Sequence, residues 1–328
     1  MSEQPWVALR QHLRHPQPAL CLLVGSGTHA QWNPATGGEQ RAKGILSSWP
    51  SLLNTLGAGS LHQHAPPTLQ WELLAMGEAP SAVLRDSRDM TATKWQSLSA
   101  FKRERALQDA TARVVADAEY ALTSSARCGL ASVQSVISSP SVTDVISLNL
   151  DTIAERMLRG WKDPARRPSA NNSAQEVAAS PARNVRIWQL HGDRRRPASI
   201  TLGVRRYAGL VSSVDDARDQ AKQRERSLRY AEAKKKAQSS PRSWMELMLH
   251  RPLLVLGASL SESEWDLWQA LVDRHRNYAK HTNRRYLPPA WILCTPCTGR
   301  NVPSHWFRRL EAPNWNAAWE RLAELTRG

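Results

Sequence analysis

Short apolar stretches recur along the chain, and their lengths are typical of buried β-strands. Each contains roughly five to seven residues, which is too short for most helices and suits a strand buried on both faces. Turn residues or charged residues bound most of them. They are residues 19–24, 142–148, 185–190, 252–256 and 290–294.

Helical patterns separate these stretches. Residues 101–124 and 265–276 place apolar side chains three or four positions apart, as an amphipathic helix does. Alternation of strands with helices requires crossover connections and favours a parallel sheet. The sequence therefore predicts an α/β fold, with a Rossmann-like, mostly parallel sheet, helices on both faces and a helical side lobe.

The sequence predicts a single domain over residues 1–328, and the tracts between the elements named above are assigned as follows. The helical lobe is expected at about residues 49–124, with Ser48 capping its first helix, and a charged helical insertion at about residues 213–240. Polar or proline-rich tracts predict loops at residues 32–43, 77–93 and 160–182. Residues 290–294 are expected to form the last strand.

The composition is that of a folded protein, with 41% hydrophobic and 22% charged residues. No stretch approaches the ~20 apolar residues that cross a bilayer. The first six residues lack the basic-then-apolar layout of a secretory signal, so we expect a cytoplasmic protein without a membrane partner. The net charge of +15 would attract nucleic acid, an acidic partner or a polyanionic ligand, and a solvated basic surface explains it equally well.

The chain has four cysteines: Cys21, Cys128, Cys294 and Cys297. Cys21 and Cys294 fall inside predicted strands, where a free thiol behaves as a small buried hydrophobe. Cys294 and Cys297 have CxxC spacing, but a structural zinc site normally needs four ligands, and the chain has no second pair. We therefore expect no zinc.

Three of the predicted strands end in residues suited to phosphate binding or catalysis. The first ends in Gly25-Ser26-Gly27-Thr28, where backbone amides could approach a phosphate. The third glycine of the dinucleotide fingerprint is missing, so a plain strand-to-helix turn is the alternative. Because parallel strands end at one edge of the sheet, these segments predict a nucleotide site there.

The other two strand ends carry Asn149, Asp151 and His191. Asn149 and Asp151 can point into one crevice if the chain between them is extended, whereas the alternative makes Asn149 a turn residue and Asp151 a helix cap. A neutral imidazole at His191 suits a general base near pH 7. A buried histidine bonded to the backbone is the alternative.

Together these segments resemble the sirtuin-like family of NAD-consuming enzymes. Ser147-Leu148-Asn149-Leu150-Asp151 is similar to the family's Thr-x-Asn-x-Asp segment, and His191-Gly192 is similar to its catalytic His-Gly. Gly25-Ser26-Gly27-Thr28 resembles its first phosphate loop, and Gly257-Ala258-Ser259 resembles its Gly-x-Ser turn. The resemblance implies NAD as substrate, bound by Gly25, Ser26, Gly27, Thr28, Gly257 and Ser259, with Asn149, His191 and Asp151 catalytic.

Departures from the family pattern narrow the expected reaction. Deacylating sirtuins carry a Gly-Ile-Pro-Asp-Phe-Arg loop, and this chain has Gly44-Ile45-Leu46-Ser47-Ser48-Trp49 at the comparable place. The two cysteine pairs of the zinc module are also missing. Both differences fit better with the bacterial sirtuin-like domains of anti-phage systems, which hydrolyse NAD. We therefore expect an NAD glycohydrolase that cleaves the nicotinamide–ribose bond and is gated by homo-oligomerisation or by a protein partner.

Three other functions remain open. One is a catalytically silent module that binds NAD or ADP-ribose and scaffolds a partner, for which His191 would be dispensable. Another is nucleic-acid binding through the basic surface. The least favoured is NAD-dependent protein deacylation, because of the departures described above.

Overall fold

The computed structural model describes most of the chain. Described residues are 3–14, 19–32, 34–58, 65–77, 80–86, 90–124, 131–157, 178–179, 185–230, 243–258, 260, 264–279, 287–295, 302–303 and 305–327. Cys128, Ser259 and Cys297 lie outside them, as does most of the loop expected at residues 160–182.

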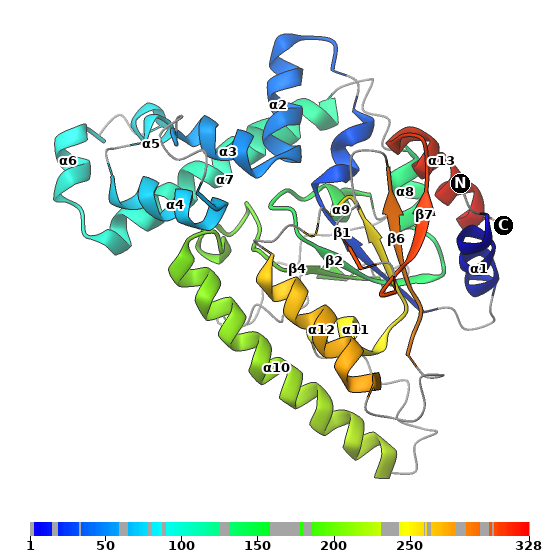
Figure 1. Cartoon of the computed structure of the whole chain (residues 1–328). Coiled ribbons are helices and arrows are strands. Elements are labelled where there is room, and N and C mark those ends of the chain that lie inside the picture. The colour runs from blue at the N-terminus through cyan, green and yellow to red at the C-terminus, as the bar shows by residue number, and fades with distance from the viewer. Residues whose placement is uncertain are drawn as a thin grey trace.

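A seven-stranded sheet forms the centre of the molecule, in the order β3-β4-β2-β1-β5-β6-β7 (Figure 1). The two-residue edge strand β3 is antiparallel to β4, and all the other neighbours are parallel. The predicted mostly parallel α/β sheet is confirmed. Its strands are β1 (Leu20–Val24), β2 (Val142–Ser147), β3 (Ala178–Ala179), β4 (Arg186–Gln189), β5 (Leu253–Leu256), β6 (Ala290–Cys294) and β7 (Arg308–Glu311).

The register of the central strands aligns their carboxyl ends. Val24 at the end of β1 lies opposite Ser147 of β2 and Leu256 of β5, and Ser147 lies opposite Gln189 of β4. The chain leaves β1 for β2 on one side and reaches β5 on the other, so the strand order reverses at β1. A crevice for ligands is expected at such a switch point.

Helices cover both faces of the sheet because side chains along the buried strands alternate between two cores. Cys21 and Leu23 of β1 pack toward one core, which includes side chains of α10, α11 and α12. Leu20 and Leu22 pack toward the other core, with α1, α8, α13 and the lobe helices. These helices are α1 (Gln4–Leu13), α8 (Ala131–Ile137), α9 (Ile153–Arg156), α10 (Val204–Tyr230), α11 (Trp244–His250), α12 (Trp265–Ala279) and α13 (Trp315–Arg327).

A group of helices stands beside the sheet, at the upper left of Figure 1. The long helix α7 contacts α2, α3, α4 and α5, and its buried side chains hold the group together. Ser48 caps α3 as expected, since its hydroxyl accepts a hydrogen bond from the Ser51 amide. The group consists of α2 (Gly37–Ser47), α3 (Trp49–Leu56), α4 (Pro67–Met76), α5 (Ser81–Asp86), α6 (Ala92–Ser97) and α7 (Ala100–Ser124).

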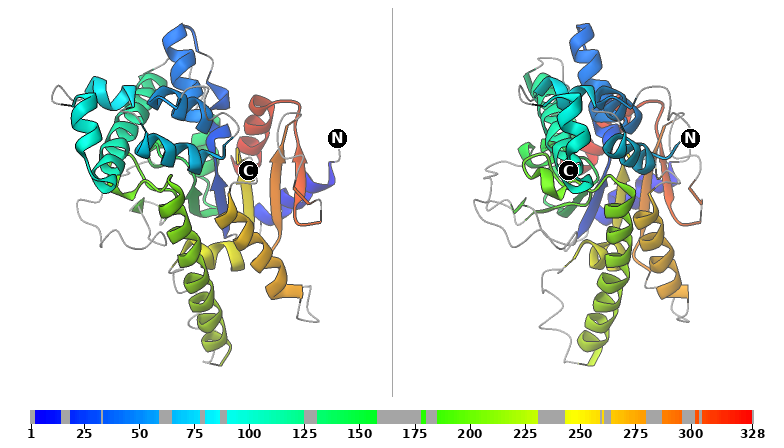
Figure 2. Two further views of the ribbon diagram at one scale, coloured as in Figure 1. Left: turned by 60° about the vertical axis from the view of Figure 1, so that its left-hand side comes forward. Right: turned by 90° about the vertical axis from the view of Figure 1, so that its left-hand side faces the viewer.

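The charged helix α10 starts earlier in the chain than the sequence pattern indicated. It begins at Val204 rather than near residue 213, and its 27 residues give it a length of about 40 Å. Its first half packs on α11, α12 and α4, while its end extends away from the sheet in both views of Figure 2.

Three sequence-based predictions about local structure were wrong. Residues 37–43, expected in a loop, begin helix α2, because Thr36 and Glu39 form a reciprocal capping box that offsets the helix-weakening Gly37-Gly38 pair. The tract 77–93 contains α5 and the start of α6. The strand at 290–294 is followed by β7 and α13, and β7 was missed because an edge strand reading Arg-Arg-Leu-Glu buries only Leu310.

Candidate functional site

The glycine turns after β1 and β5 pack backbone against backbone. A Cβ atom at Gly25 would lie 2.6 Å from the carbonyl oxygen of Gly257, and one at Gly27 would lie 2.6 Å from the Gly257 Cα. Gly257 has φ of +65°, which disfavours other residues. The glycines are therefore required where two strand-end loops meet at the switch point.

The amides of this turn are used within the protein, which differs from the expectation of free amides for a phosphate. Gly25 N donates to the carbonyl of Leu256, Gly27 N to that of Gly257, and Thr28 N to that of Gly25. The short 3-10 helix η1 (Ser26–Gln31) follows directly. The turn thus presents backbone atoms around Gly25 and Ser26 to the adjacent cleft, while Gly27 and Thr28 support it from behind.

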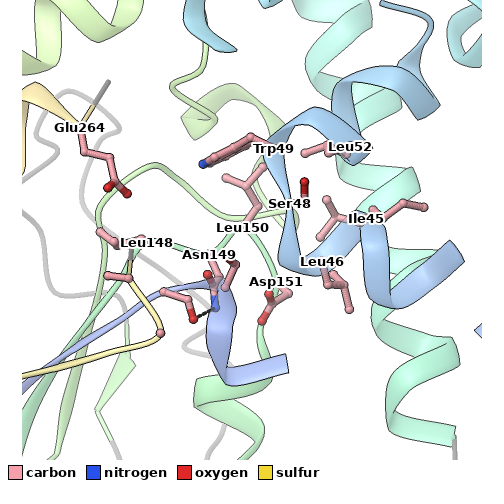
Figure 3. Close-up of a pocket in the computed structure, with 15 residues that line it drawn as sticks. Ile45, Leu46, Ser48, Trp49, Leu52, Leu148, Asn149, Leu150, Asp151 and Glu264 are labelled. Carbon is pink, nitrogen blue, oxygen red and sulfur yellow. Dashed lines mark hydrogen bonds between the residues drawn. The ribbon is translucent and has the colours of Figure 1, made fainter. Parts of the chain in front are cut away.

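Asn149 follows β2 and lies beside the glycine turn. Its Nδ2 atom donates to the carbonyl oxygen of Gly25 at 3.4 Å, and its backbone amide contacts the Ser147 hydroxyl at 3.3 Å. These contacts leave the amide oxygen facing away from Gly25, on the cleft side of the residue (Figure 3). The side chain is half-buried, so it is fixed and still reachable by a ligand.

Asp151 is buried and tied to the protein on both sides. Its Oδ2 atom lies 3.2 Å from Nε2 of His29, and its Oδ1 accepts a hydrogen bond from the Ile153 amide at the start of α9. Burial acts to raise the pKa of Asp151, but His29, the Ile153 amide and Arg194 outweigh it and lower the pKa. Asp151 is therefore ionised, and it binds both the first amide of α9 and the His29 ring beside the turn.

A cleft of about 550 Å³ opens between the strand-end loops and the lobe. Gly25, Ser26, Asn149, Asp151 and Gly257 line its sheet side. Its other wall comes from α2 and α3, as Figure 3 shows. The wall residues are Ile45, Leu46, Ser48, Trp49 and Leu52.

His191 lies in an adjoining pocket of about 410 Å³. Its Nε2 atom is 3.2 Å from Oδ2 of Asp266, which is fully buried at the start of α12. The hydroxyl of Tyr207, on α10, donates to the other oxygen of Asp266. Three separate segments therefore hold the imidazole ring in one orientation.

The surroundings of His191 favour its protonated form. Burial acts to lower the pKa of His191, but hydrogen bonding to Asp266, together with the charges of Asp266 and Glu264, raises the pKa overall. Burial and the neighbouring Asp266 raise the pKa of Tyr207, so its hydroxyl keeps its proton. The pKa of Asp266 is lowered, because its bonds to His191 and Tyr207 outweigh the effect of burial. The result is an Asp–His pair in which the carboxylate stabilises the protonated imidazole.

The cleft and the pocket share two of their described lining residues, Trp49 and Glu264. A ligand that reaches both Asn149 and His191 would therefore lie next to the region that these two side chains line.

The structure brings together most residues that the sequence singled out. Gly25, Ser26, Asn149, Asp151 and Gly257 share the cleft, and His191 lines the next cavity. Gly27 and Thr28 shape the turn without lining the cleft, and Ser259 lies outside the described residues.

Four residues of the site were not among those candidates. His29, Trp49, Glu264 and Asp266 contact the expected residues or line the same cavities. His29 could have been found, because it directly follows the glycine turn. Asp266 lies 75 positions from His191, and nothing in the local sequence connects the two.

A buried ionic cluster ties α7 of the lobe to the strand ends. Glu119 on α7 is fully buried and accepts hydrogen bonds from the backbone and hydroxyl of Thr152 at 3.0 and 2.6 Å. Arg194 binds both of its carboxylate oxygens, and Arg156 lies 2.8 Å away. Such a fully paired buried carboxylate fixes geometry, since removing one partner costs about 3–5 kcal/mol.

Beneath the strand ends lies a second buried carboxylate, Glu155. Gln189 and Arg195 donate to its Oε1 atom at 2.8 and 2.9 Å, while Oε2 has no hydrogen-bond partner among the described residues. Burial is the main reason that the pKa of Glu155 is raised, to about 7.

Within the part of the chain that the structure describes, no three His, Cys, Asp or Glu side chains are grouped as a metal site would require. Among the same residues, no helix is long and apolar enough to cross a bilayer.

Comparison with known families gives one match. Residues 143–294 match the model of the SIR2-like domain, a range that includes Asn149, Asp151, His191 and Gly257. No curated protein matches the chain. SIR2-like domains use NAD as a substrate. The matched range and the α/β sheet around it therefore support a sirtuin-like family and an NAD-related enzymatic activity for this chain.

Proposed function

We propose that the protein is an NAD glycohydrolase that cleaves the bond between nicotinamide and ribose. The observation that supports this most is the pair of adjoining cavities, with Asn149 lining one and His191, bound to Asp266, lining the other. The SIR2-like match supports NAD as the substrate. Gly25, Ser26 and Gly257 line the cleft, so the two glycine turns would lie against the phosphates and the adenosine side of a dinucleotide.

The residues of the cleft fit the parts of this reaction. As the bond breaks, positive charge moves from the nicotinamide ring onto the ribose, and water then attacks C1′. Asn149, fixed by Gly25, would position the water or the ribose through its amide oxygen. His191 would accept the proton from water or a ribose hydroxyl, and ionised Asp151 would hold the turn in place through His29.

The lining of the cleft favours hydrolysis over protein deacylation. The segment Ser47-Ser48-Trp49, of which Ser48 and Trp49 line the cleft, stands in place of the acidic and arginine residues that deacylating sirtuins place against nicotinamide. The differences fit an effector of bacterial anti-phage defence, which is the role we propose.

An NAD hydrolase that ran without control would deplete its own cell. We therefore propose that homo-oligomerisation or a protein partner, such as a nucleic-acid sensor, gates the activity. We also propose that the chain is one sirtuin-like domain, with the lobe at about residues 49–124 acting on the cleft and α10 forming a charged insertion. The lobe suits gating because α3 supplies one wall of the cleft.

NAD consumption by purified protein, alone and with the products of neighbouring genes, tests the proposal. Asn149→Ala should reduce turnover on the order of 100-fold, and Asn54→Ala, on the exposed side of α3, should not. NAD left equally intact by wild type and Asn149→Ala in every state would refute the hydrolase. A biological effect that survives in His191→Ala would instead support a silent binding module.

Gating is tested by comparing oligomeric states. Activity should appear with the assembled form or with the partner. Full turnover by a purified monomer without any trigger would contradict this part of the proposal.

A further inference from the structure

Glu264 stands at the junction of the two cavities. It immediately precedes α12, is half-buried, and lines both the Asn149 cleft and the His191 pocket. In Figure 3 its carboxylate lies on the side of the cleft that faces Leu148 and Asn149. Trp49 is the other described residue that both cavities share.

The position of Glu264 determines which part of a bound substrate would lie next to its carboxylate. In the proposed reaction, one substrate contacts Asn149 in the first cavity and His191 in the second. The part of the substrate between them is then the part that lies next to Glu264 and Trp49. In a dinucleotide cleaved at the nicotinamide ribose, this part is the ribose that becomes positively charged.

The other carboxylates near the site are more deeply buried than Glu264. Asp151 is buried against His29 and the Ile153 amide, and Asp266 is bound by His191 and Tyr207. Among the described residues that line the two cavities, the carboxylates belong to Asp151 and Glu264. Of these two, Glu264 is the more exposed to the cavities.

We propose that Glu264 is a further catalytic residue, whose carboxylate stabilises the positive charge that develops on the ribose. This inference rests on the proposed function. In the step, the C1′–N bond breaks and its electron pair passes to the nicotinamide nitrogen, which becomes neutral. The water oxygen then bonds to C1′, and its proton goes to His191, so that the products are nicotinamide, ADP-ribose and one proton.

The surroundings of Glu264 strengthen the effect. The indole of Trp49 lies near His191, with ring centroids 6.4 Å apart, and forms an apolar wall of both cavities. A charge interaction is stronger beside such a wall than in open water. Glu264 also acts on the base, since its charge contributes to raising the pKa of His191.

Glu264→Gln tests the proposal because it keeps the size of the side chain and removes its charge. We expect kcat to fall on the order of 100-fold, with KM within about threefold of wild type. Glu264→Asp keeps the charge on a shorter chain and should recover part of the loss. Glu311→Gln, an exposed residue of edge strand β7, should match wild type and serves as the control.

Two measurements separate a charge effect from an effect on structure or on His191. Rates are compared on the alkaline plateau, where His191 is unprotonated in all variants. Binding of a carbocyclic NAD analogue, which cannot form the ribosyl cation, should be unchanged in Glu264→Gln.

The possible outcomes distinguish this inference from the proposed function. If wild type consumes NAD and Glu264→Gln does so with kcat within threefold, the inference is wrong and the hydrolase stands. Parallel losses of catalysis and analogue binding would also overturn it, since they indicate a structural role. If the wild-type protein leaves NAD intact, alone and with every partner tested, both the Glu264 inference and the proposed hydrolase function are wrong.

Discussion

Buried Glu155 should make the free energy of unfolding depend on pH, and this dependence can be measured. It is buried below the strand ends, and Gln189 and Arg195 bind only its Oε1 atom. Its raised pKa of about 7 means that the folded protein holds a proton that the unfolded chain releases near pH 4.5. The folded state is thus relatively stable below pH 4.5 and loses this stability as the pH rises toward 7.

The size of the effect follows from the two pKa values. The difference between 4.5 and about 7, at 1.36 kcal/mol per unit, corresponds to about 3 kcal/mol in the free energy of unfolding. Glu155→Gln removes the titration and keeps an oxygen that can accept from Gln189 and Arg195. The free energy of unfolding of this variant, minus that of wild type, should therefore increase by about 3 kcal/mol between pH 4.5 and 8.

Denaturant unfolding of both proteins across this pH range is the assay. Taking the difference cancels the other titrating groups, including Asp151, Asp266 and His191. Glu320→Gln, on an exposed position of α13, should show no comparable change with pH. A difference between Glu155→Gln and wild type that stays constant from pH 5 to 8, or shrinks, would refute the reasoning.

Two further predictions concern the site. Asp266→Asn removes the main group that raises the pKa of His191, so the acidic limb of the kcat/KM profile for NAD should move to lower pH; an unmoved limb would show that Asp266 does not tune His191. Gly257→Ala forces a Cβ to within 2.7 Å of Thr28 N at φ of +65°, and should lower the free energy of unfolding by about 2–4 kcal/mol. Gly37→Ala is its control: a Cβ there meets nothing within 4 Å, and equal losses in the two variants would contradict the close-packing argument.

The sheet could be predicted from the sequence because its interior strands are continuous apolar runs. Both faces of these strands are buried, so each run stands out against the helices between them. β7 lacked this signal, since as an edge strand it buries only Leu310. Helix α2 was hidden by two glycines, although its Thr36–Glu39 capping box was present in the sequence.

The sequence alone also indicated which strand-end residues lie near the switch point. Parallel strands end at the same edge, so Gly25, Asn149 and His191 had to lie on one side of the sheet once the strands were placed. It left open whether Asp151 is a cap or a site residue. In the structure Asp151 lines the cleft, with one oxygen at the Ile153 amide and the other at His29.

Only the tertiary structure decided which helices form the second wall of the cleft and which side chains hold His191 and shift its pKa. The wall made by α2 and α3, the Asp266–Tyr207 support of the imidazole and the place of Glu264 between two cavities all depend on contacts between distant segments. Local patterns of hydrophobicity reflect burial and periodicity within one element. Such patterns do not indicate which other helix or strand packs against that element. The chemistry of this site depends on these contacts between elements.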